Sequence, residues 1–251
     1  MRLTVVGCSG SYPGPDSPAS CYLVEADQHG QTWRVLVELG NGALGALHRY
    51  VDPLSIDAVL LSHLHADHCL DLCGYYVMRK YHPTGPQPRI PVWGPDGTAD
   101  RMARAYDLPC EPGMTEEFDF RVYDGAFQLG PFAIEPVPVE HPVPAYGLRI
   151  TADGRTLAYS GDTAPCHGLD QVAHGAELLL AEASFEVGGD NPDGLHLTGA
   201  DCGAVASRVG VKSLVVTHVP PWHDREVALR EATEQYDGPV ELARPGAVYE
   251  L

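Results

Sequence analysis

One segment constrains this chain more than any other: Leu60-Leu61-Ser62-His63-Leu64-His65-Ala66-Asp67-His68. An apolar run ends there, and four side chains able to bind metal fall within six residues. In an extended chain His63 and His65 point to the same side, so both imidazoles can face one ion. Asp67 and His68 follow where the chain turns into a helix, and they can face a neighbouring ion. The spacing predicts two adjacent metal sites, although solvated histidines at a polar strand end are a simpler alternative.

Four residues do not complete two metal sites, so further ligands are expected at the ends of later strands. Candidates that follow apolar runs are His141 after Val137-Pro138-Val139-Glu140, Asp162 after Leu157–Gly161, and His218 after Leu214–Thr217. Taken singly, each is compatible with an ordinary turn or cap residue. Taken jointly with the first cluster, they supply the ligands that the two sites lack.

Short apolar runs bounded by turn residues alternate with helical patterns along the whole chain. Strands are expected at Leu3–Val6, Cys21–Glu25, Arg34–Leu39, Ala58–Leu61, Ile90–Trp93, Phe132–Val139, Gly147–Ile150, Thr156–Ser160, Leu178–Ala183 and Ser213–Thr217. Helices are expected near Ala66–Tyr81, Thr98–Tyr106, Thr198–Val209 and Asp224–Tyr236. Many runs are too continuous to leave one face wet, which indicates sheets covered by helices in a layered α/β fold. No linker divides the chain, so we expect a single domain over residues 1–251.

Composition and charge bear on the location of the protein, the role of its cysteines and its partners. No run approaches the roughly 18 apolar residues that span a bilayer, and the first residues lack the apolar stretch of a signal peptide, so a cytoplasmic location is expected. The 7 cysteines are odd in number and form no Cys-x-x-Cys pair. They indicate neither a disulfide framework nor a thiolate zinc site. The net charge of −18 argues against a general nucleic-acid binder, because it repels polyanions.

With these residues together, the chain resembles the metallo-β-lactamase-fold hydrolases, whose motifs are His-x-His-x-Asp-His, a later His, an Asp after a strand and a final His. The resemblance implies a four-layer αββα sandwich. It also implies a first ion held by the residues matching His63, His65 and His141. The second ion would be held by those matching Asp67, His68 and His218, with Asp162 bridging both. Histidine and carboxylate ligands favour Zn²⁺ and also suit Mn²⁺ or Fe. Two such ions, about 3.5–4 Å apart, serve hydrolysis.

Further motifs resemble the phosphodiesterase branch that contains ribonuclease Z. They are Gly7-Cys8-Ser9-Gly10-Ser11, Ser20-Cys21-Tyr22-Leu23, Gly40-Asn41-Gly42, Ala181-Glu182-Ala183-Ser184-Phe185 and His196-Leu197-Thr198. The resemblance implies that Glu182 orients His196, which donates a proton to the departing oxygen. Asp67, Glu182 and His196 are therefore the predicted catalytic residues. Ala181 departs from the family's His-Glu-Ala-Thr motif. A plainer interpretation makes His196 a helix cap and Glu182 a surface carboxylate.

Only 20 residues separate His141 from Asp162, where ribonuclease Z carries its long tRNA-gripping arm. The interval holds a strand pair joined by Ala152-Asp153-Gly154-Arg155, an Asp-Gly hairpin signal. Together with Gly14–Ser20 and Thr217-His218-Val219-Pro220-Pro221-Trp222, the chain resembles actinobacterial cyclic-nucleotide phosphodiesterases related to ribonuclease Z. This implies attack of metal-bound hydroxide on cyclic AMP or cyclic GMP, releasing a 5′-monophosphate.

Two alternatives remain open from the sequence. The first is a tRNA 3′-processing endonuclease, and the second is a non-catalytic metal-binding protein on the same fold. The expected partner is a small phosphodiester rather than a membrane or nucleic acid. A homodimer is compatible with the sequence, but no segment marks an interface.

Overall fold

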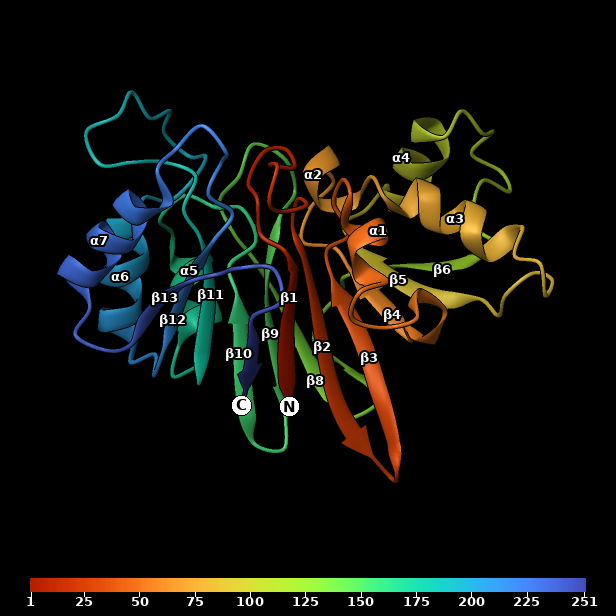
Figure 1. Cartoon of the computed structure of the whole chain (residues 1–251), viewed down its shortest axis with the longest axis horizontal. Helices are drawn as coiled ribbons and strands as arrows, with labels where there is room; N and C mark the ends of the chain where they lie inside the picture. The colour runs from red at the N-terminus through yellow and green to blue at the C-terminus, as the bar shows by residue number, and fades with distance from the viewer.

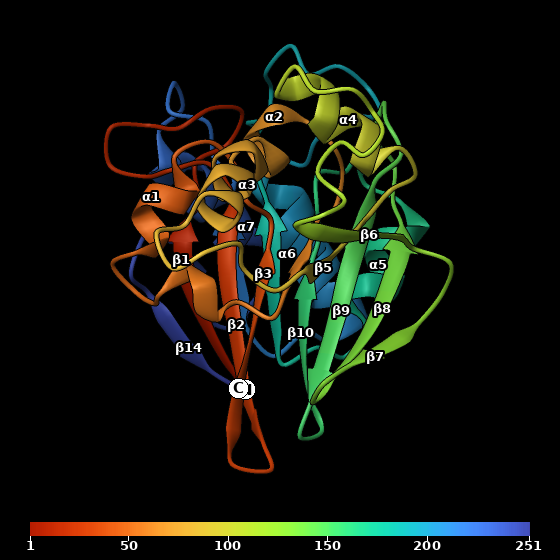
Figure 2. The same ribbon diagram turned by 90° about the vertical axis from the view of Figure 1, so that its right-hand side faces the viewer.

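Two seven-stranded β-sheets face each other in the computed structural model, which describes all residues 1–251 (Figures 1 and 2). The first sheet has the order β14-β1-β2-β3-β4-β5-β6, and the second has the order β13-β12-β11-β10-β9-β8-β7. The strands of the first sheet are β1 (Arg2–Gly7), β2 (Cys21–Gln28), β3 (Gln31–Val37), β4 (Ala58–Leu60), β5 (Ile90–Gly94), β6 (Phe118–Val122) and β14 (Val248–Glu250). Those of the second are β7 (Phe127–Leu129), β8 (Phe132–Pro138), β9 (Tyr146–Ala152), β10 (Arg155–Tyr159), β11 (Leu178–Glu182), β12 (Leu214–Thr217) and β13 (Val240–Leu242).

Helices cover the outer face of each sheet, as Figure 1 shows. The first sheet is covered by α1 (Ala43–Leu47), α2 (Ala66–Cys69), α3 (Leu72–Lys80) and α4 (Thr98–Ala105), and the second by α5 (His167–Ala173), α6 (Gly199–Val209) and α7 (Arg225–Gln235). A 3₁₀ turn, Pro53–Ser55, precedes β4. None of the helices combines the length and apolar character that a membrane crossing requires.

Three apolar cores of similar size separate these layers, with 22, 21 and 20 buried residues. Side chains alternate between cores along a strand because successive residues of a strand face opposite ways. In β2, for example, Tyr22 and Val24 enter the core between the sheets, whereas Cys21 and Leu23 enter the core beneath the helices. Both faces of the central strands are thus buried, which explains their continuous apolar sequences. The predicted αββα sandwich is confirmed.

All ten predicted strands are present, and four strands were not predicted: β6, β7, β13 and β14. These four are the outer strands of the two sheets. An edge strand has one neighbour and is partly exposed, so its sequence lacks the apolar run used to find the others. In β14, for instance, Val248 and Glu250 are both exposed.

The predicted helix Ala66–Tyr81 was wrong in one respect, because the structure divides it into α2 and α3. The division lies where Leu39, just after β3, binds the helical backbone. The amide of Leu39 donates to the carbonyl oxygen of His68, and the amide of Asp71 donates to the carbonyl oxygen of Leu39. These bonds replace the helical ladder at this point. The carboxylate of Asp71 also accepts from the amide of Leu44 in α1, which fixes the turn against its neighbour.

Candidate metal centre

The side chains that the sequence singles out lie just beyond the carboxyl ends of strands in both sheets. His63 and His65 follow β4, His141 follows β8, Asp162 follows β10 and His218 follows β12. Because β10, β11 and β12 are parallel, their ends meet at one edge of the second sheet. This edge faces the end of β4 and the helix α2 that follows it (Figure 1). Segments far apart in the sequence therefore converge here.

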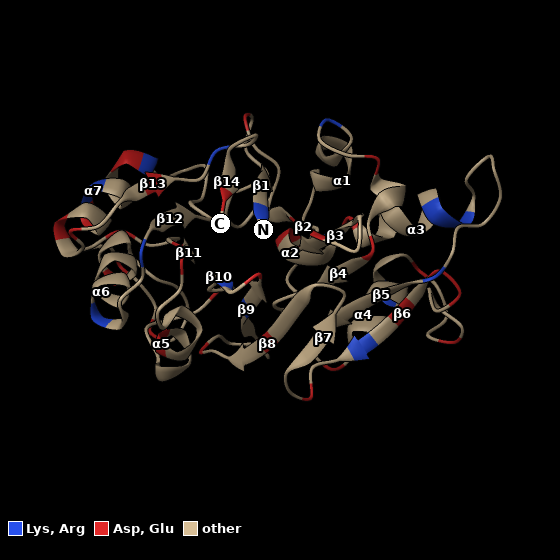
Figure 3. Ribbon diagram, turned by 90° about the horizontal axis from the view of Figure 1, so that it is seen from below, with Lys and Arg blue, Asp and Glu red and all other residues tan.

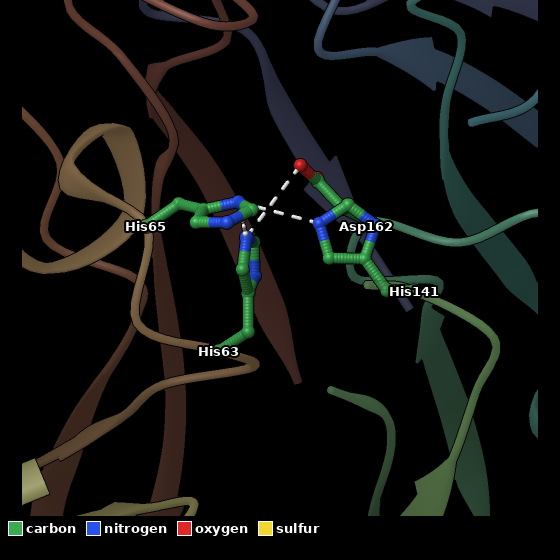
Figure 4. A group of neighbouring side chains, drawn as sticks. All are labelled: His63, His65, His141 and Asp162. Carbon is green, nitrogen blue, oxygen red and sulfur yellow. Dashed lines mark hydrogen bonds and ion pairs between the residues drawn. The ribbon is translucent and has the colours of Figure 1, made fainter. Parts of the chain in front are cut away.

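A first group consists of His63, His65, His141 and Asp162 (Figure 4). Nε2 of His63 lies 3.0 Å from Nδ1 of His65, and Nε2 of His141 lies 3.3 Å from the same atom. Oδ2 of Asp162 lies 3.7 Å from Nε2 of His63. One nitrogen or oxygen of each side chain falls within 4.8 Å of all the others, as ligands around a single cation must.

A second group consists of Asp67, His68, Asp162 and His218, with the same mutual distance limit of 4.8 Å. Nε2 of His218 lies 3.1 Å from Oδ2 of Asp67 and 3.1 Å from Nε2 of His68. Oδ1 of Asp162 lies 3.3 Å from Nε2 of His68. Asp162 belongs to both groups, with one oxygen facing each. All seven predicted ligands are therefore brought together, in the two sets that the sequence resemblance implied.

The donor set suits divalent cations. Nδ1 of His65 faces Nε2 of both His63 and His141, and a hydrogen on Nδ1 can serve only one of these two nitrogens, whereas one cation would bind all three. Oδ1 of Asp162 is buried and accepts no hydrogen bond in spite of its short distance to His68. Imidazole and carboxylate ligands without sulfur are those used by zinc, manganese and iron sites. The residues present thus fit divalent metal binding.

The pKa shifts in the first group favour the protonation states that metal ligands need. Burial lowers the pKa of His63, His65 and His141, which favours the neutral, ligating imidazole. Burial works against ionisation of Asp162, but its interactions with His218, His68 and His63 outweigh burial and lower the pKa of the carboxyl group. Neutral imidazoles around an ionised carboxylate are the form in which these side chains bind a cation.

His68 differs from the other imidazoles. Its burial opposes a charge, yet the carboxylates of Asp162, Glu38 and Asp67 raise its pKa. The burial of Asp67 is in turn outweighed by His68 and His218, which lower the pKa of Asp67. The second group thus places the protonated imidazole of His68 among carboxylates. A divalent cation that displaces this proton would be stabilised by the same negative charges.

A second ring of contacts orients the imidazoles through the nitrogen that faces away from the centre. Nδ1 of His68 makes no hydrogen bond and lies 3.5 Å from Oε1 of Glu38, an ion-pair distance. Hydrogen-bond contacts join Nδ1 of His63 to Oγ of Ser62 (3.0 Å), Nδ1 of His218 to Oγ of Ser184 (2.8 Å) and Nδ1 of His141 to the carbonyl oxygen of Leu195 (3.0 Å). Such partners fix the ring orientation and the tautomer of metal-binding histidines.

Glu38 is a residue of the centre that the sequence analysis missed. It follows β3, is fully buried, and accepts a hydrogen bond from the amide of Ser62 at 2.9 Å. Its backbone φ is +65°, a value rare for a residue other than glycine and often found near functional sites. The signal was available, because Glu38 is an acidic residue at the end of an apolar run, as is Asp162.

Two glycines allow the backbone to approach the centre closely. A Cβ on Gly40 would overlap the carbonyl oxygen of Asp67, and a Cβ on Gly10 would overlap that of His218. His218 itself has φ +54°, so its side chain is aimed by an unusual backbone conformation. The loops after β1 and β3 therefore need glycine where they pack behind these residues.

His196 and Glu182 lie beside both groups. Nδ1–H of His196 donates to Oε1 of Glu182 at 2.8 Å, which leaves Nε2 on the opposite edge of the ring. The imidazole centre is 5.5 Å from that of His141 and 6.0 Å from that of His218. Burial alone would lower the pKa of His196, but the charge and hydrogen bond of Glu182 raise it to about 9. The imidazole is thus prepared to hold a proton at neutral pH.

The plainer interpretation of these two residues was wrong. Glu182 is fully buried at the end of β11, where its carboxylate also accepts from the amides of Thr163 and Ser184, both at 3.0 Å. The helix α6 is capped by Thr198, whose hydroxyl accepts from the amide of Asp201 in a capping box. His196 is therefore free of the cap, and Glu182 is not at the surface.

Fold and site together define a class. Residues 34–219 match the family model of the beta-lactamase superfamily domain, and the chain belongs to this superfamily. With its paired histidine and aspartate groups, it is a metal-dependent hydrolase of the metallo-β-lactamase fold.

Several known proteins are similar to this chain over most of their length. The chain is 46% identical over 246 residues to the uncharacterized protein Rv1339 of Mycobacterium tuberculosis, covering 96% of this chain and 88% of that protein. It is 27% identical to the probable metallo-hydrolase YhfI of Bacillus subtilis over the full length of both chains. The crystal structure of YhfI superposes with a TM-score of 0.88, covering 100% of this chain and 99% of that one. Ribonuclease Z of Mycolicibacterium paratuberculosis is 31% identical, covering 88% of this chain and 86% of that enzyme.

Proposed function

We propose that this protein is a dinuclear metal-dependent phosphodiesterase acting on a small phosphodiester, and that its substrates are 3′,5′-cyclic nucleotides such as cyclic AMP and cyclic GMP. The products are nucleoside 5′-monophosphates. Residues 1–251 form one catalytic domain in this proposal. The cations are zinc, with manganese or iron as substitutes, and their ligands are His63, His65 and His141 for the first, Asp67, His68 and His218 for the second, and Asp162 for both.

The observation that carries the proposal is the Glu182–His196 pair beside the two groups. A phosphodiester has a poor leaving group, an alkoxide, which needs a proton as its bond to phosphorus breaks. Glu182 is held by two backbone amides and cannot turn away, so it fixes the ring of His196 in one orientation. The carboxylate also keeps the imidazole charged, because it raises its pKa to about 9.

The division of labour follows from these contacts. Two divalent cations, when bound, lower the pKa of water and neutralise charge on phosphoryl oxygens. Asp67 and Asp162 keep the ligand groups negative, and the buried serines and Glu38 behind the histidines keep the rings aligned. His196 holds the proton that passes from Nε2 to the 3′-oxygen as the bond between phosphorus and that oxygen breaks. Glu182 stabilises the imidazolium before transfer.

Two features favour a small substrate over RNA. The strands β9 and β10 occupy most of the interval between His141 and Asp162. They form an antiparallel pair in which Arg155 lies opposite Ala152 and Tyr159 lies opposite Leu148. No part of that interval extends outward as an arm. The net charge is −18, and the ribbon of Figure 3, seen from the end opposite α2, shows lysine and arginine scattered over several elements. RNA binding draws its energy from basic surfaces.

The second candidate function is tRNA 3′-end processing, which the similarity to ribonuclease Z favours. A direct comparison separates the two. Purified, metal-loaded protein would be offered cyclic AMP, cyclic GMP, a 3′-extended tRNA precursor and bis-p-nitrophenyl phosphate. We expect hydrolysis of the cyclic nucleotides and of the nitrophenyl ester. Rapid cleavage of the RNA alone would establish the second candidate, and metal binding without turnover of any phosphodiester would indicate a non-catalytic metal protein.

A further inference from the structure

Two exposed aromatic rings, Tyr12 and Trp222, stand on loops that flank His218. Tyr12 is 42% exposed and Trp222 is 61% exposed. Their ring centres are 5.2 Å apart, and their planes are inclined by 34°. Tyr12 belongs to the loop after β1, and Trp222 belongs to the loop after β12. Because the two side chains contact each other and remain accessible, they form a small apolar patch on the surface.

Both loops are fastened to the ligand His218. The amide of His218 donates to the carbonyl oxygen of Cys8 at 3.1 Å, and the amide of Gly10 donates to that of Val219 at 3.2 Å. The turn that carries Tyr12 is closed by its own amide, which donates to the carbonyl oxygen of Gly10 at 2.7 Å. The two loops rise together at the same end of the molecule as α2, in both views (Figures 1 and 2).

The aromatic pair is therefore near the centre. Four residues of chain span at most about 14 Å, so the backbone of Trp222 lies within that distance of His218. Gly10, two residues before Tyr12, packs against the backbone of His218 and the outer edge of its ring, since a Cβ there would overlap the carbonyl oxygen and come within 3.1 Å of Nδ1. The rings thus stand on short, hydrogen-bonded loops that are fixed to the backbone around His218.

A second connection runs to the proton donor. The ring centre of His223, next to Trp222, is 6.1 Å from the indole, and its Nδ1 is 3.2 Å from Oε1 of Glu186. The residue before Glu186 is Phe185, whose ring packs edge-on against His196 at 5.1 Å. The loop that carries Trp222 and the loop that precedes His196 are therefore joined by the contact between His223 and Glu186.

We propose that Tyr12 and Trp222 form a stacking subsite for the nucleobase of the substrate. This inference rests on the proposed function, because it assigns one end of a nucleotide whose phosphate lies at the metal groups. A flat base can lay one π-face against the exposed side of this aromatic pair whatever its hydrogen-bonding edge, so the subsite accepts adenine and guanine alike. It supplies affinity without adding positive charge, which this acidic chain lacks.

The kinetic test compares two substrates that differ only in the base. Cyclic AMP is set against methyl riboside 3′,5′-cyclic phosphate, in which a methoxy group replaces adenine. Base stacking by one aromatic side chain corresponds to roughly 5- to 150-fold in affinity. We expect Trp222→Ala and Tyr12→Ala to reduce the ratio of kcat/KM for cyclic AMP to that for the baseless ester by this factor. Trp222→Phe should restore most of it.

A matched control is Tyr106→Ala, which removes a ring that is 39% exposed and packs on Tyr76 beside α3. It should leave the ratio unchanged. Equal losses on both substrates in the Trp222→Ala variant would show a merely structural role and overturn the subsite. An unchanged ratio would also overturn it, while leaving cyclic-nucleotide hydrolysis intact.

A binding measurement keeps the inference testable if cyclic nucleotides are not hydrolysed. The chain has 3 tryptophans, and Trp33 and Trp93 pack against the core between the sheets. Adenosine 5′-monophosphate should quench the tryptophan fluorescence of the wild-type protein, whereas ribose 5-phosphate should not. Loss of that quenching in Trp222→Phe, with retention in Trp93→Phe, supports the subsite. Quenching that survives in Trp222→Phe would refute it.

Discussion

Replacing His196 by asparagine separates proton donation from every other role of the site. Asparagine keeps an N–H that can donate to Glu182, but it cannot deliver a proton. Glu182 retains its bonds from the amides of Thr163 and Ser184, so the buried carboxylate stays satisfied in the variant. The seven predicted metal ligands are untouched. The substitution therefore removes one chemical function and leaves the surrounding contacts in place.

The expected magnitude follows from the leaving group. General acid catalysis contributes about 10²–10⁴-fold, which corresponds to about 3–5 kcal/mol of activation free energy. The full loss in kcat is expected for cyclic AMP, whose 3′-alkoxide requires a proton. Bis-p-nitrophenyl phosphate releases a stable phenolate, so its kcat should fall by less than about tenfold if proton transfer is the only function lost.

The assay measures kcat for both esters at saturating substrate, together with the metal content and the Tm of each variant. A selective loss on cyclic AMP, at unchanged metal content, supports the role of His196 as the proton donor. An equal loss on both esters, or the loss of a metal ion, would refute it. An unchanged kcat on cyclic AMP would reduce His196 to a structural residue.

Three further predictions concern the centre and its supports. Asp162→Ala should abolish activity and reduce bound metal more than Asp67→Ala, which spares the first group, and elemental analysis would contradict this if both variants kept two ions. Gly40→Ala should lower the free energy of unfolding by about 1–3 kcal/mol in urea denaturation, because a Cβ would overlap the carbonyl oxygen of Asp67. Gly45→Ala, where the added Cβ meets nothing within 4 Å, is the control and should not destabilise. The proposed role makes the protonated form of His196 the donor, and its pKa is raised to about 9, so kcat on cyclic AMP should decrease as the pH rises through that value. A flat profile across that range would count against the assignment.

The sequence predicted the central strands because burial on both faces leaves a continuous apolar run. It could not reveal the edge strands, which are stabilised by one neighbour and carry polar residues such as Glu241 in β13. The division between α2 and α3 was equally hidden. It depends on hydrogen bonds from Leu39, a residue that is distant in sequence and whose position is set only by the packed sheet.

For the site, residue chemistry at strand ends was informative. His141, Asp162 and His218 were each ambiguous alone, and the structure brings all three to the His63–His68 segment; their roles as ligands stay a prediction. Glu38 escaped notice because it has no metal-binding motif around it and acts through His68. The contact between Tyr12 and Trp222 could not be foreseen, since it joins loops separated by almost the whole chain.

The metal groups combine residues from both halves of the chain, and this has a consequence for the order in which the protein folds and binds metal. Four of the seven clustered side chains lie between residues 63 and 68, in the half of the chain that forms most of the first sheet. The other three, His141, Asp162 and His218, lie in the half that forms the second sheet. A nascent polypeptide in which only the amino-terminal half has folded cannot present either complete set. We therefore expect the complete ligand sets to bind cations only after both halves have folded, and a cation bound by residues of both halves stabilises the folded state.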